Sequence, residues 1–408
     1  MKYSQELRRR LVVLLGVFGG ALFVGCRSTP SGEGIAPRAD AVSRPAPRPL
    51  PRPVRAIWVA RFDYRYAADV RTIIRNCAQL GCNTVFWQVR GAGTVTYPSR
   101  LEPWAPEFNF ADPGFDPLQL AVAEAHRHGL RLEAWVNVLP GWRGEKPPPV
   151  RGQLWNAHPA WFLQDAQGYR QALGDWYLIV NPCWPEVRQH IVRVVEEIVS
   201  RYDVDGVHLD YVRYAWDSEK DAARKYPRDR RTLALYRRDT GLGPDDDANA
   251  WKHWRANQLT RLVVELRSLL NRRRPGATLT AAVVRHPRIA YDQYFQNGMA
   301  WLRTGLVDAL LPMAYTDKIS QFDADIAAYR QLAGARRIVP GVGIYQHKQP
   351  EVMREQLARC VAWGGDFALF SYASLYLTHQ DRAQHKRSVA EEQARPWRRA
   401  VLAEFMAR

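Results

Sequence analysis

DGVHLDYVRY, residues 205–214, places a carboxylate, an imidazole and a guanidinium in a run that otherwise has the apolar composition of a buried parallel strand. Burying such groups without partners costs several kcal/mol, so polar side chains in a strand of this kind usually serve a function. In a barrel of alternating strands and helices, catalytic side chains lie at the carboxyl ends of the strands. The run therefore predicts a buried strand with a functional site at its end.

Side chains alternate between the two faces of a strand, and here the alternation separates polar from apolar residues. Val207, Leu209 and Tyr211 share one face, which suits contact with a layer of helices. His208 and Asp210 share the other face. We therefore expect His208 and Asp210 to point into the barrel, with Asp210 nearest the carboxyl end.

The rest of the chain supports a barrel. From residue 55 onward, short β-branched or aromatic runs alternate with amphipathic helical patterns. The expected strands are 56–61, 84–90, 131–138, 206–212, 278–284, 308–315, 338–345 and 366–372. Eight strands alternating with helices predict a (β/α)8 TIM barrel. An open doubly wound sheet is disfavoured, because no glycine-rich phosphate turn follows the first strand.

Two long segments interrupt the regular alternation. Residues 141–179 follow the third expected strand and are rich in Pro, Trp and Gly, and residues 217–249 follow the fourth and are charged. Both follow the carboxyl end of a strand, so they predict extended loops on the catalytic face.

The N-terminus has the pattern of an export signal. A basic region precedes an apolar stretch that ends at Cys26, which resembles a bacterial lipobox, so we expect Cys26 to be lipidated. An ordinary signal peptide with a chance cysteine is the alternative. Arg27, rather than Asp, favours an outer-membrane anchor facing the periplasm. The expected organisation is a lipoprotein signal peptide (1–26), a Pro/Arg-rich linker (27–54), the barrel (55–385) and a C-terminal helical tail (386–408).

Charge and cysteine content limit the partners. The formal net charge is +17. For an exported protein this favours anionic envelope polymers over nucleic acid, and an arginine-rich solvated face is the simpler alternative. Of the five cysteines, those other than Cys26 lack metal-ligand spacing and are expected to be buried thiols. Disulfides are the alternative in an oxidising compartment, with Cys77–Cys82 as the only local pair. We expect no metal and no cofactor.

Polar and aromatic residues gather at the carboxyl ends of other expected strands, which meet on one face of a barrel. Five tryptophans, Trp104, Trp135, Trp142, Trp155 and Trp216, fall in or beside the presumed cleft loops and suit stacking on sugar rings. The candidate substrate-binding residues are Arg61, Gln88, Arg90, Trp135, Asn137, His208, Tyr211, Arg213, Tyr315, Asp317 and Tyr372.

Several motifs together resemble the glycosyl-hydrolase-like family 10. They are RAIWVARFD (55–63), NTVFWQVR (83–90), AHRHG (125–129), AWVN (134–137), DGVHLD (205–210) and PMAY (312–315). The resemblance implies a bacterial barrel protein, commonly a lipoprotein, in a family that includes enzymes cutting peptidoglycan glycan strands. It also implies a catalytic role for Asp210. The chitinase strand-four motif is similar, but His208 and Val212 replace two of its acids, so that mechanism does not carry over.

The resulting hypothesis is a glycoside hydrolase acting on an envelope or extracellular polysaccharide. Such enzymes generally need two carboxyl groups. Asp210 is the expected nucleophile or base, and Asp63 and Glu102 are the leading candidates for the acid, with Asp317 behind them. Trp104 could give Glu102 an apolar pocket that raises its pKa.

Three arginines, Arg61, Arg90 and Arg213, would orient Asp210 and keep it ionised. The alternative for Asp210 is a structural carboxylate paired with His208 or Arg213. A rival function is a non-catalytic glycan-binding lipoprotein on a degenerate glycosidase barrel, which would lack a second carboxyl group near Asp210. A basic envelope scaffold that binds anionic polymer is a third possibility.

Overall fold

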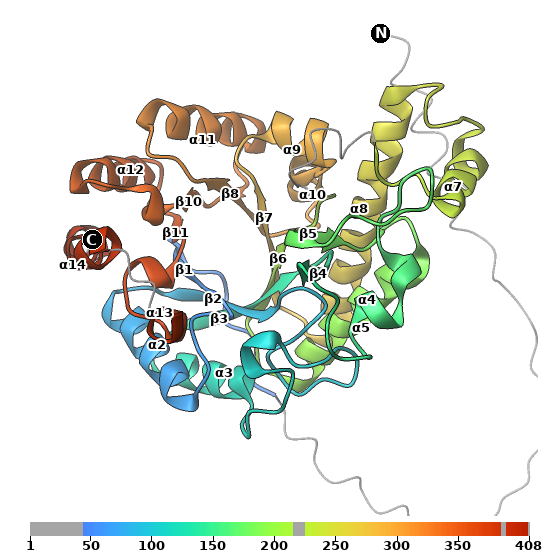
Figure 1. The fold of residues 1–408 in the computed structure, drawn as a ribbon. Coiled ribbons are helices and arrows are strands. Elements are labelled where there is room, and N and C mark those ends of the chain that lie inside the picture. Colours follow the sequence, from blue (N-terminus) through green and yellow to red (C-terminus); the bar gives the residue numbers. More distant parts are fainter. Residues whose placement is uncertain (1–43, 215–224, 385–388, 407–408) are drawn as a thin grey trace, which may run out of the picture. The chain divides into compact units, whose positions relative to one another are not determined.

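The computed structural model describes residues 44–214, 225–384 and 389–406. From Pro45 onward the chain forms a closed parallel barrel ringed by helices (Figure 1), which confirms the predicted (β/α)8 fold. The sheet order is β10-β11-β1-β2-β3-β6-β7-β8-β9, and an additional pairing of β10 with β8 closes the barrel. Its strands are β1 (Arg55–Val59), β2 (Thr84–Arg90), β3 (Arg131–Asn137), β6 (Gly206–Asp210), β7 (Thr278–Val284), β8 (Ala309–Ala314), β9 (Arg337–Ile338), β10 (Gly341–Val342) and β11 (Phe367–Leu369).

One barrel position differs from its prediction. Two short strands, β9 and β10, replace the single strand expected at 338–345. Pro340 lies between them and has no N–H to donate to a neighbouring strand. The chain resumes its pairing at Gly341, where β10 contacts both β8 and β11.

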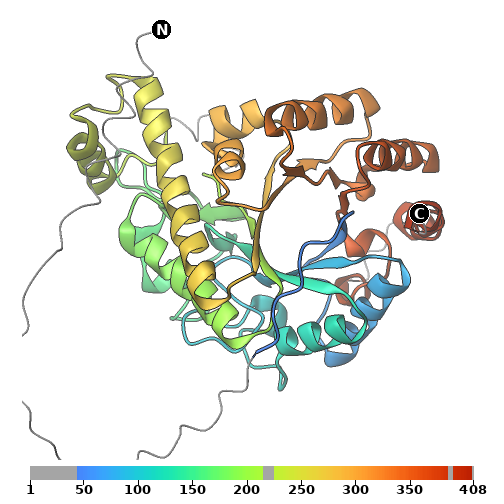
Figure 2. The ribbon, with the colours of Figure 1, turned by 180° about the vertical axis from the view of Figure 1, so that it is seen from behind.

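Helices follow the strands around the barrel. Seen from the opposite side in Figure 2, α8 lies beside α5, and the two are in contact. The helices of the ring are α2 (Ala67–Gln79), α3 (Pro117–Arg127), α5 (Pro185–Arg201), α8 (Ala248–Arg273), α9 (Pro287–Tyr294), α10 (Gly298–Arg303), α11 (Ile319–Ala333), α12 (Pro350–Ala362) and α14 (Val389–Met406). Outside the ring lie α4 (Leu154–Ala157), α7 (Arg230–Thr240) and α13 (His379–Gln384), with short 3-10 turns at Pro106–Phe108, Pro159–Trp161, Ile344–Gln346 and Tyr372–Ser374.

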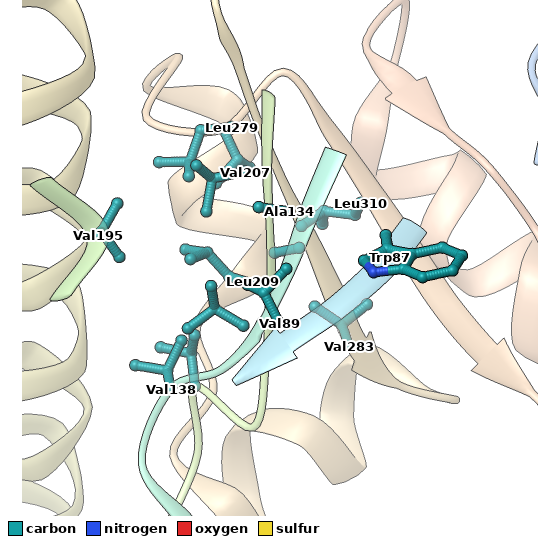
Figure 3. Close-up of a cluster of buried hydrophobic side chains, with 14 of the residues drawn as sticks. Trp87, Val89, Ala134, Val138, Val195, Val207, Leu209, Leu279, Val283 and Leu310 are labelled. Atoms are coloured by element: carbon teal, nitrogen blue, oxygen red, sulfur yellow. The ribbon is translucent and has the colours of Figure 1, made fainter. Parts of the chain in front are cut away.

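The alternation predicted for the fourth strand is present in β6. Val207 and Leu209 belong to the apolar layer between sheet and helices, where Figure 3 shows them in one cluster with Val195 of α5. His208 faces inward and stacks on Phe86, with 4.2 Å between ring centroids. The polar residues of the strand are therefore separated from the helix layer, as expected.

The barrel begins earlier in the chain than the predicted linker boundary. Residues 45–54, assigned to a spacer, cross the amino ends of the strands (dark blue in Figure 2). The amide of Arg48 donates to Asp205 Oδ1 at 2.7 Å, and its guanidinium donates to Leu130 O at 2.9 Å. Leu50 packs against the apolar cluster inside the barrel. This segment is part of the fold.

The expected C-terminal tail is also part of the barrel. Its helix α14 packs against α12 and follows the last strand, so it occupies the position of the eighth helix of the ring. Arg398 is 2% exposed and donates from Nη2 to His347 O at 3.1 Å. The folded domain therefore extends to Met406.

The first long insertion is an ordered hairpin. Its strands β4 (Pro140–Gly144) and β5 (Gly174–Ile179) pair antiparallel beside the carboxyl ends of the barrel strands. The second insertion is described only from residue 225 onward, where α7 forms. The predicted signal peptide, lipidation site Cys26 and Trp216 lie outside the described residues. Across the ranges the structure covers, no helix is long and apolar enough for a membrane span.

The cysteines of the described chain are free, buried thiols, as predicted: Cys77, Cys82, Cys183 and Cys360.

Candidate active site

A cavity of about 900 Å³ lies at the carboxyl ends of the barrel strands. Its position is the one at which barrel enzymes hold their catalytic groups. Of the residues predicted to form the site, those that line it are Asp63, Gln88, Trp135, Asn137, Asp210, Tyr211, Arg213 and Tyr315. These come from β2, β3 and β6 and from the turns after β1, β6 and β8, so the expected convergence of strand ends is present.

Asp210 is the last residue of β6 and is 6% exposed. Its Oδ1 accepts the amide hydrogen of Tyr211 at 2.7 Å. Burial raises the pKa of Asp210 above its ordinary value, while the Arg213 guanidinium, the Tyr211 amide and the Trp135 indole each act to lower it. Asp210 is thus a desolvated carboxyl group with a cation close by, which is an environment suited to acid–base or nucleophilic chemistry.

Tyr211 lines the cavity because the chain leaves strand geometry immediately after Asp210. Its φ is 53°, in the left-handed region that a residue with a side chain rarely adopts. Continued alternation would have turned Tyr211 toward the helices with Leu209, and that expectation is wrong. Its ring meets Tyr177 edge-on at 4.8 Å, and the Arg213 guanidinium lies 4.1 Å from its centroid. Burial raises the pKa of Tyr211 to about 12.

Asp63 is the second carboxyl group on the cavity. It is 3% exposed, and its Oδ2 accepts the amide hydrogen of Ala60 at 2.8 Å. Burial raises the pKa of Asp63 to about 7, and Asp381 adds to this while Ala60 and Arg395 oppose it. Among the described residues that line the main cavity, Asp63 and Asp210 are the only acidic ones.

Glu102 has the surroundings of a permanent anion, which makes it a poor candidate for the acid. Burial alone would raise its pKa, but Arg90 and His190 lower the pKa of Glu102 to about 2. Arg90 donates to it from Nε at 2.8 Å and from Nη2 at 2.6 Å. The carboxylate does not line the cavity, and the apolar pocket expected from Trp104 is not its environment.

His208 lies below the cavity, in the barrel core. Trp58 Nε1 can only donate and lies 3.0 Å from His208 Nε2, so that nitrogen accepts. His208 Nδ1 then donates to Thr280 Oγ1 at 2.8 Å, and Thr280 donates to Glu133. Burial lowers the pKa of His208 to about 3. His208 is therefore a neutral structural residue, and it does not contact the cavity.

Two further predicted residues lie away from the cavity. Tyr372 is 1% exposed, and its hydroxyl accepts a hydrogen bond from Asn76 Nδ2 at 2.8 Å within the apolar core. Asp317 is exposed and does not line the cavity. Both belong to loops after strand ends, where position along the chain alone does not fix the direction of a side chain.

The three arginines predicted to hold Asp210 have different roles. Only Arg213 lowers the pKa of Asp210. Arg61 pairs with Glu107, with 3.0 Å between Nε and Oε1. Arg90 pairs with Glu102 and also donates from Nη1 to Val138 O at 3.0 Å, so it fixes the chain just after β3.

The structure adds aromatic and basic groups that the sequence did not single out. Phe370 stacks on Tyr315 with 4.9 Å between centroids. Period-two alternation along the first strand could have revealed Trp58, but nothing in the sequence places Tyr177 of β5 over the cavity. The missed lining residues include Trp58, Phe62, Arg143, Tyr177, Arg285, Tyr345, Phe370 and Gln380.

The tryptophans expected in the cleft divide into two groups. Trp135 lines the main cavity, and Trp142 lines a smaller one beside it. Trp104 and Trp155 pack in the apolar core instead. In the ranges that the structure describes, no three His, Cys, Asp or Glu side chains are grouped so that they could hold a metal ion.

Comparisons with known structures support the same architecture. The glycoside hydrolase domain of PgaB (BpsB) from Bordetella bronchiseptica superposes with a TM-score of 0.61 at 16% identity, covering 84% of this chain and 98% of that one. Alpha-L-fucosidase isoenzyme 2 from Paenibacillus thiaminolyticus gives a TM-score of 0.59 at 14% identity, over 87% of this chain and 49% of that one. At such identities the likeness shows the fold alone.

Sequence comparison gives the family. Glycosyl hydrolase DigH of Escherichia coli (strain K12) is 29% identical over 345 residues, which cover 75% of each protein. Glycosyl hydrolase YngK of Bacillus subtilis (strain 168) is 26% identical over 298 residues, 65% of this chain and 54% of that protein. The family described as Glycosyl hydrolase-like 10 matches residues 53–355, most of the barrel. The chain therefore belongs to the Glycosyl hydrolase-like 10 family.

Proposed function

We propose that this protein is a glycoside hydrolase that cleaves a polysaccharide of the cell envelope, with peptidoglycan glycan strands as the first candidate. The observation that carries the proposal is the presence of two buried carboxyl groups, Asp63 and Asp210, on one cavity with aromatic walls. Hydrolysis of a glycosidic bond generally uses two such groups. Membership of the Glycosyl hydrolase-like 10 family points to the same reaction class.

The two carboxyl groups suit different roles. Asp63, with its pKa raised to about 7 by burial, keeps its proton below neutral pH and suits the general acid. Asp210 has the Arg213 cation nearby to favour its ionised form, so it suits the nucleophile or base. In this scheme Asp63 protonates the leaving oxygen while Asp210 attacks the sugar or activates a water molecule.

The aromatic walls suit a sugar ring. Trp135, Tyr315 and Phe370 present apolar faces to the cavity, and polar groups such as Gln88 and Asn137 lie among them. Sites of this composition hold a ligand by apolar contact and orient it with a few hydrogen bonds. The envelope substrate is proposed from the N-terminal export pattern, with lipid attachment at Cys26, and from the net charge of +17.

The test is to incubate the purified protein with peptidoglycan glycan strands and measure new reducing ends. We expect turnover, and we expect Asp210→Asn and Asp63→Asn each to abolish most of it. Asp317→Asn is the matched control, because Asp317 is exposed and lies outside the cavity. Binding without turnover on a broad panel of glycans would contradict the proposal and favour a glycan-binding lipoprotein instead.

A further inference from the structure

A second cavity adjoins the first. It has a volume of about 350 Å³. Three residues, Phe62, Arg143 and Gln380, line both cavities. The two cavities are therefore neighbours that share part of their walls.

The two cavities extend in a definite direction across the barrel end. The main cavity reaches Arg285 and Ile289, at and after the end of β7. The second cavity lies on the other side of the shared residues, between the loop after β2 and the β4–β5 hairpin. Its remaining lining residues are Arg61, Ala92, Thr94, Pro106, Glu107, Trp142, Gly144 and Asp175.

The chemistry of the second cavity suits a neutral polyol. Arg61 pairs with Glu107 at 3.0 Å, and Arg143 pairs with Asp175 at 2.7 Å. Each pair offers N–H donors next to carboxylate acceptors, which matches hydroxyl groups that both donate and accept. Because these charges are balanced, the lining has no excess cation that would favour a phosphate or another free anion.

The size of the second cavity suits one sugar unit of a glycan chain. Pockets for small molecules range from roughly 300 to 1,000 Å³. At about 350 Å³ the second cavity is at the small end of this range, and the main cavity at about 900 Å³ is near the large end. The aromatic side chains of Phe62 and Trp142 add apolar surface for a ring.

We propose that the second cavity is a distal subsite that binds a further sugar of the same glycan chain, so that the enzyme selects chains long enough to fill both cavities. This inference rests on the proposed function and names a chain-length requirement for it. The sugar passes the junction at Phe62, Arg143 and Gln380 and contacts the two ion pairs beyond it.

The test uses Asp175→Arg, which places a large cation at the rim of the second cavity. The Asp175 side chain is 77% exposed, so the fold tolerates the change, and Asp175 does not line the main cavity. Asp245→Arg is the matched control, because Asp245 is also 77% exposed and also pairs with an arginine, Arg228, away from both cavities. Circular dichroism and thermal melting check that both variants fold.

Hydrolysis is measured on disaccharide and hexasaccharide fragments of glycan strands. We expect Asp175→Arg to lower kcat/KM for the hexasaccharide about tenfold, mainly through KM, and to lower that for the disaccharide much less. Asp245→Arg should change neither. An equal loss on both fragments, or hexasaccharide cleavage unaffected by Asp175→Arg, would overturn the subsite.

Calorimetric binding separates this inference from the hydrolase proposal. In the Asp210→Asn background we expect the hexasaccharide to bind more tightly than the disaccharide, and Asp175→Arg to remove that difference. Length-dependent binding without turnover in the unaltered protein would support the subsite while contradicting hydrolysis. Turnover or binding that is independent of chain length, or no binding of either fragment, would contradict the subsite.

Discussion

Arg90 and Glu102 form a fully buried two-point ion pair, with Nε–Oε2 and Nη2–Oε1 distances of 2.8 and 2.6 Å. His190 Nε2 lies 2.9 Å from the same carboxylate. A carboxylate with two cationic or hydrogen-bonding partners stays ionised even when it is desolvated. Glu102 therefore stabilises the loop after β2 and the chain after β3, which form part of the cavity's frame.

Replacing Glu102 by Gln should cost stability without directly removing chemistry. The change leaves the buried Arg90 cation without its anion, and breaking such a pair costs about 3–5 kcal/mol. Urea unfolding should show this loss, while Glu351→Gln, on the surface of α12, should change stability little. A variant of full stability that has lost all turnover would instead make Glu102 the acid.

Asp210→Asn should remove activity without lowering stability, the reverse of the effect expected for Glu102→Gln. Because burial raises the pKa of Asp210, its ionised form is less favourable in the folded than in the unfolded protein at neutral pH. The neutral amide avoids this cost, so the melting temperature should be unchanged or higher. Turnover should fall roughly a hundredfold to ten-thousandfold, as expected for losing an acid–base group. A large fall in melting temperature would show that Asp210 is a structural carboxylate.

Asp63 should make stability depend on pH. Its pKa is raised from an ordinary 3.8 to about 7, so the folded state holds a proton that the unfolded state has released. The stabilisation that this proton gives the folded state is fully present below about pH 4 and is lost as pH rises through about 7. The shift corresponds to at most about 4 kcal/mol. Unfolding curves from pH 4 to 8 should show the decline, and Asp63→Asn should flatten it.

The raised pKa of Asp63 also predicts how turnover depends on pH. If Asp63 supplies the proton, turnover should fall above about pH 7 as that proton is lost. A rate that stays constant through pH 8 would assign the acid to another residue.

Tyr211 offers a test of backbone strain beside the site. With φ at 53°, a residue with a Cβ atom is held in a conformation that costs about 1–2 kcal/mol, and glycine avoids this cost. Tyr211→Gly should therefore be more stable than Tyr211→Ala by about 1 kcal/mol, although glycine is usually the less stable choice. Thermal melting of the two variants decides this, and the reverse order would show that the turn relaxes when the ring is removed.

The barrel and the position of its site could be predicted from local patterns. Alternation in one strand was sufficient to separate His208 and Asp210 from Val207 and Leu209, because the helix layer accepts only apolar side chains. Chain topology then brought the ends of the other strands to the same face. These inferences use only the period of a strand and the order of elements.

The features of the site that the sequence does not predict depend on contacts between residues far apart in the chain. Nothing near Glu102 in the sequence indicates that Arg90 and His190 would enclose it, so a loop carboxylate beside a tryptophan resembled an acid in an apolar pocket. Tyr177 reaches the cavity through a hairpin whose position the sequence does not fix. Tyr211 departs from alternation at a single backbone angle. Each depends on tertiary structure that no local pattern encodes.

Arg48 joins the start of the described chain to the floor of the barrel, opposite the cavity. Its amide binds Asp205, and its carbonyl accepts from Arg131 Nε at 2.9 Å, both at the amino ends of strands. The segment from Pro45 to Val54 therefore lies behind the catalytic face. These bonds hold the beginning of the barrel domain at the end remote from the cavity, so this segment leaves the mouth of the cleft unobstructed.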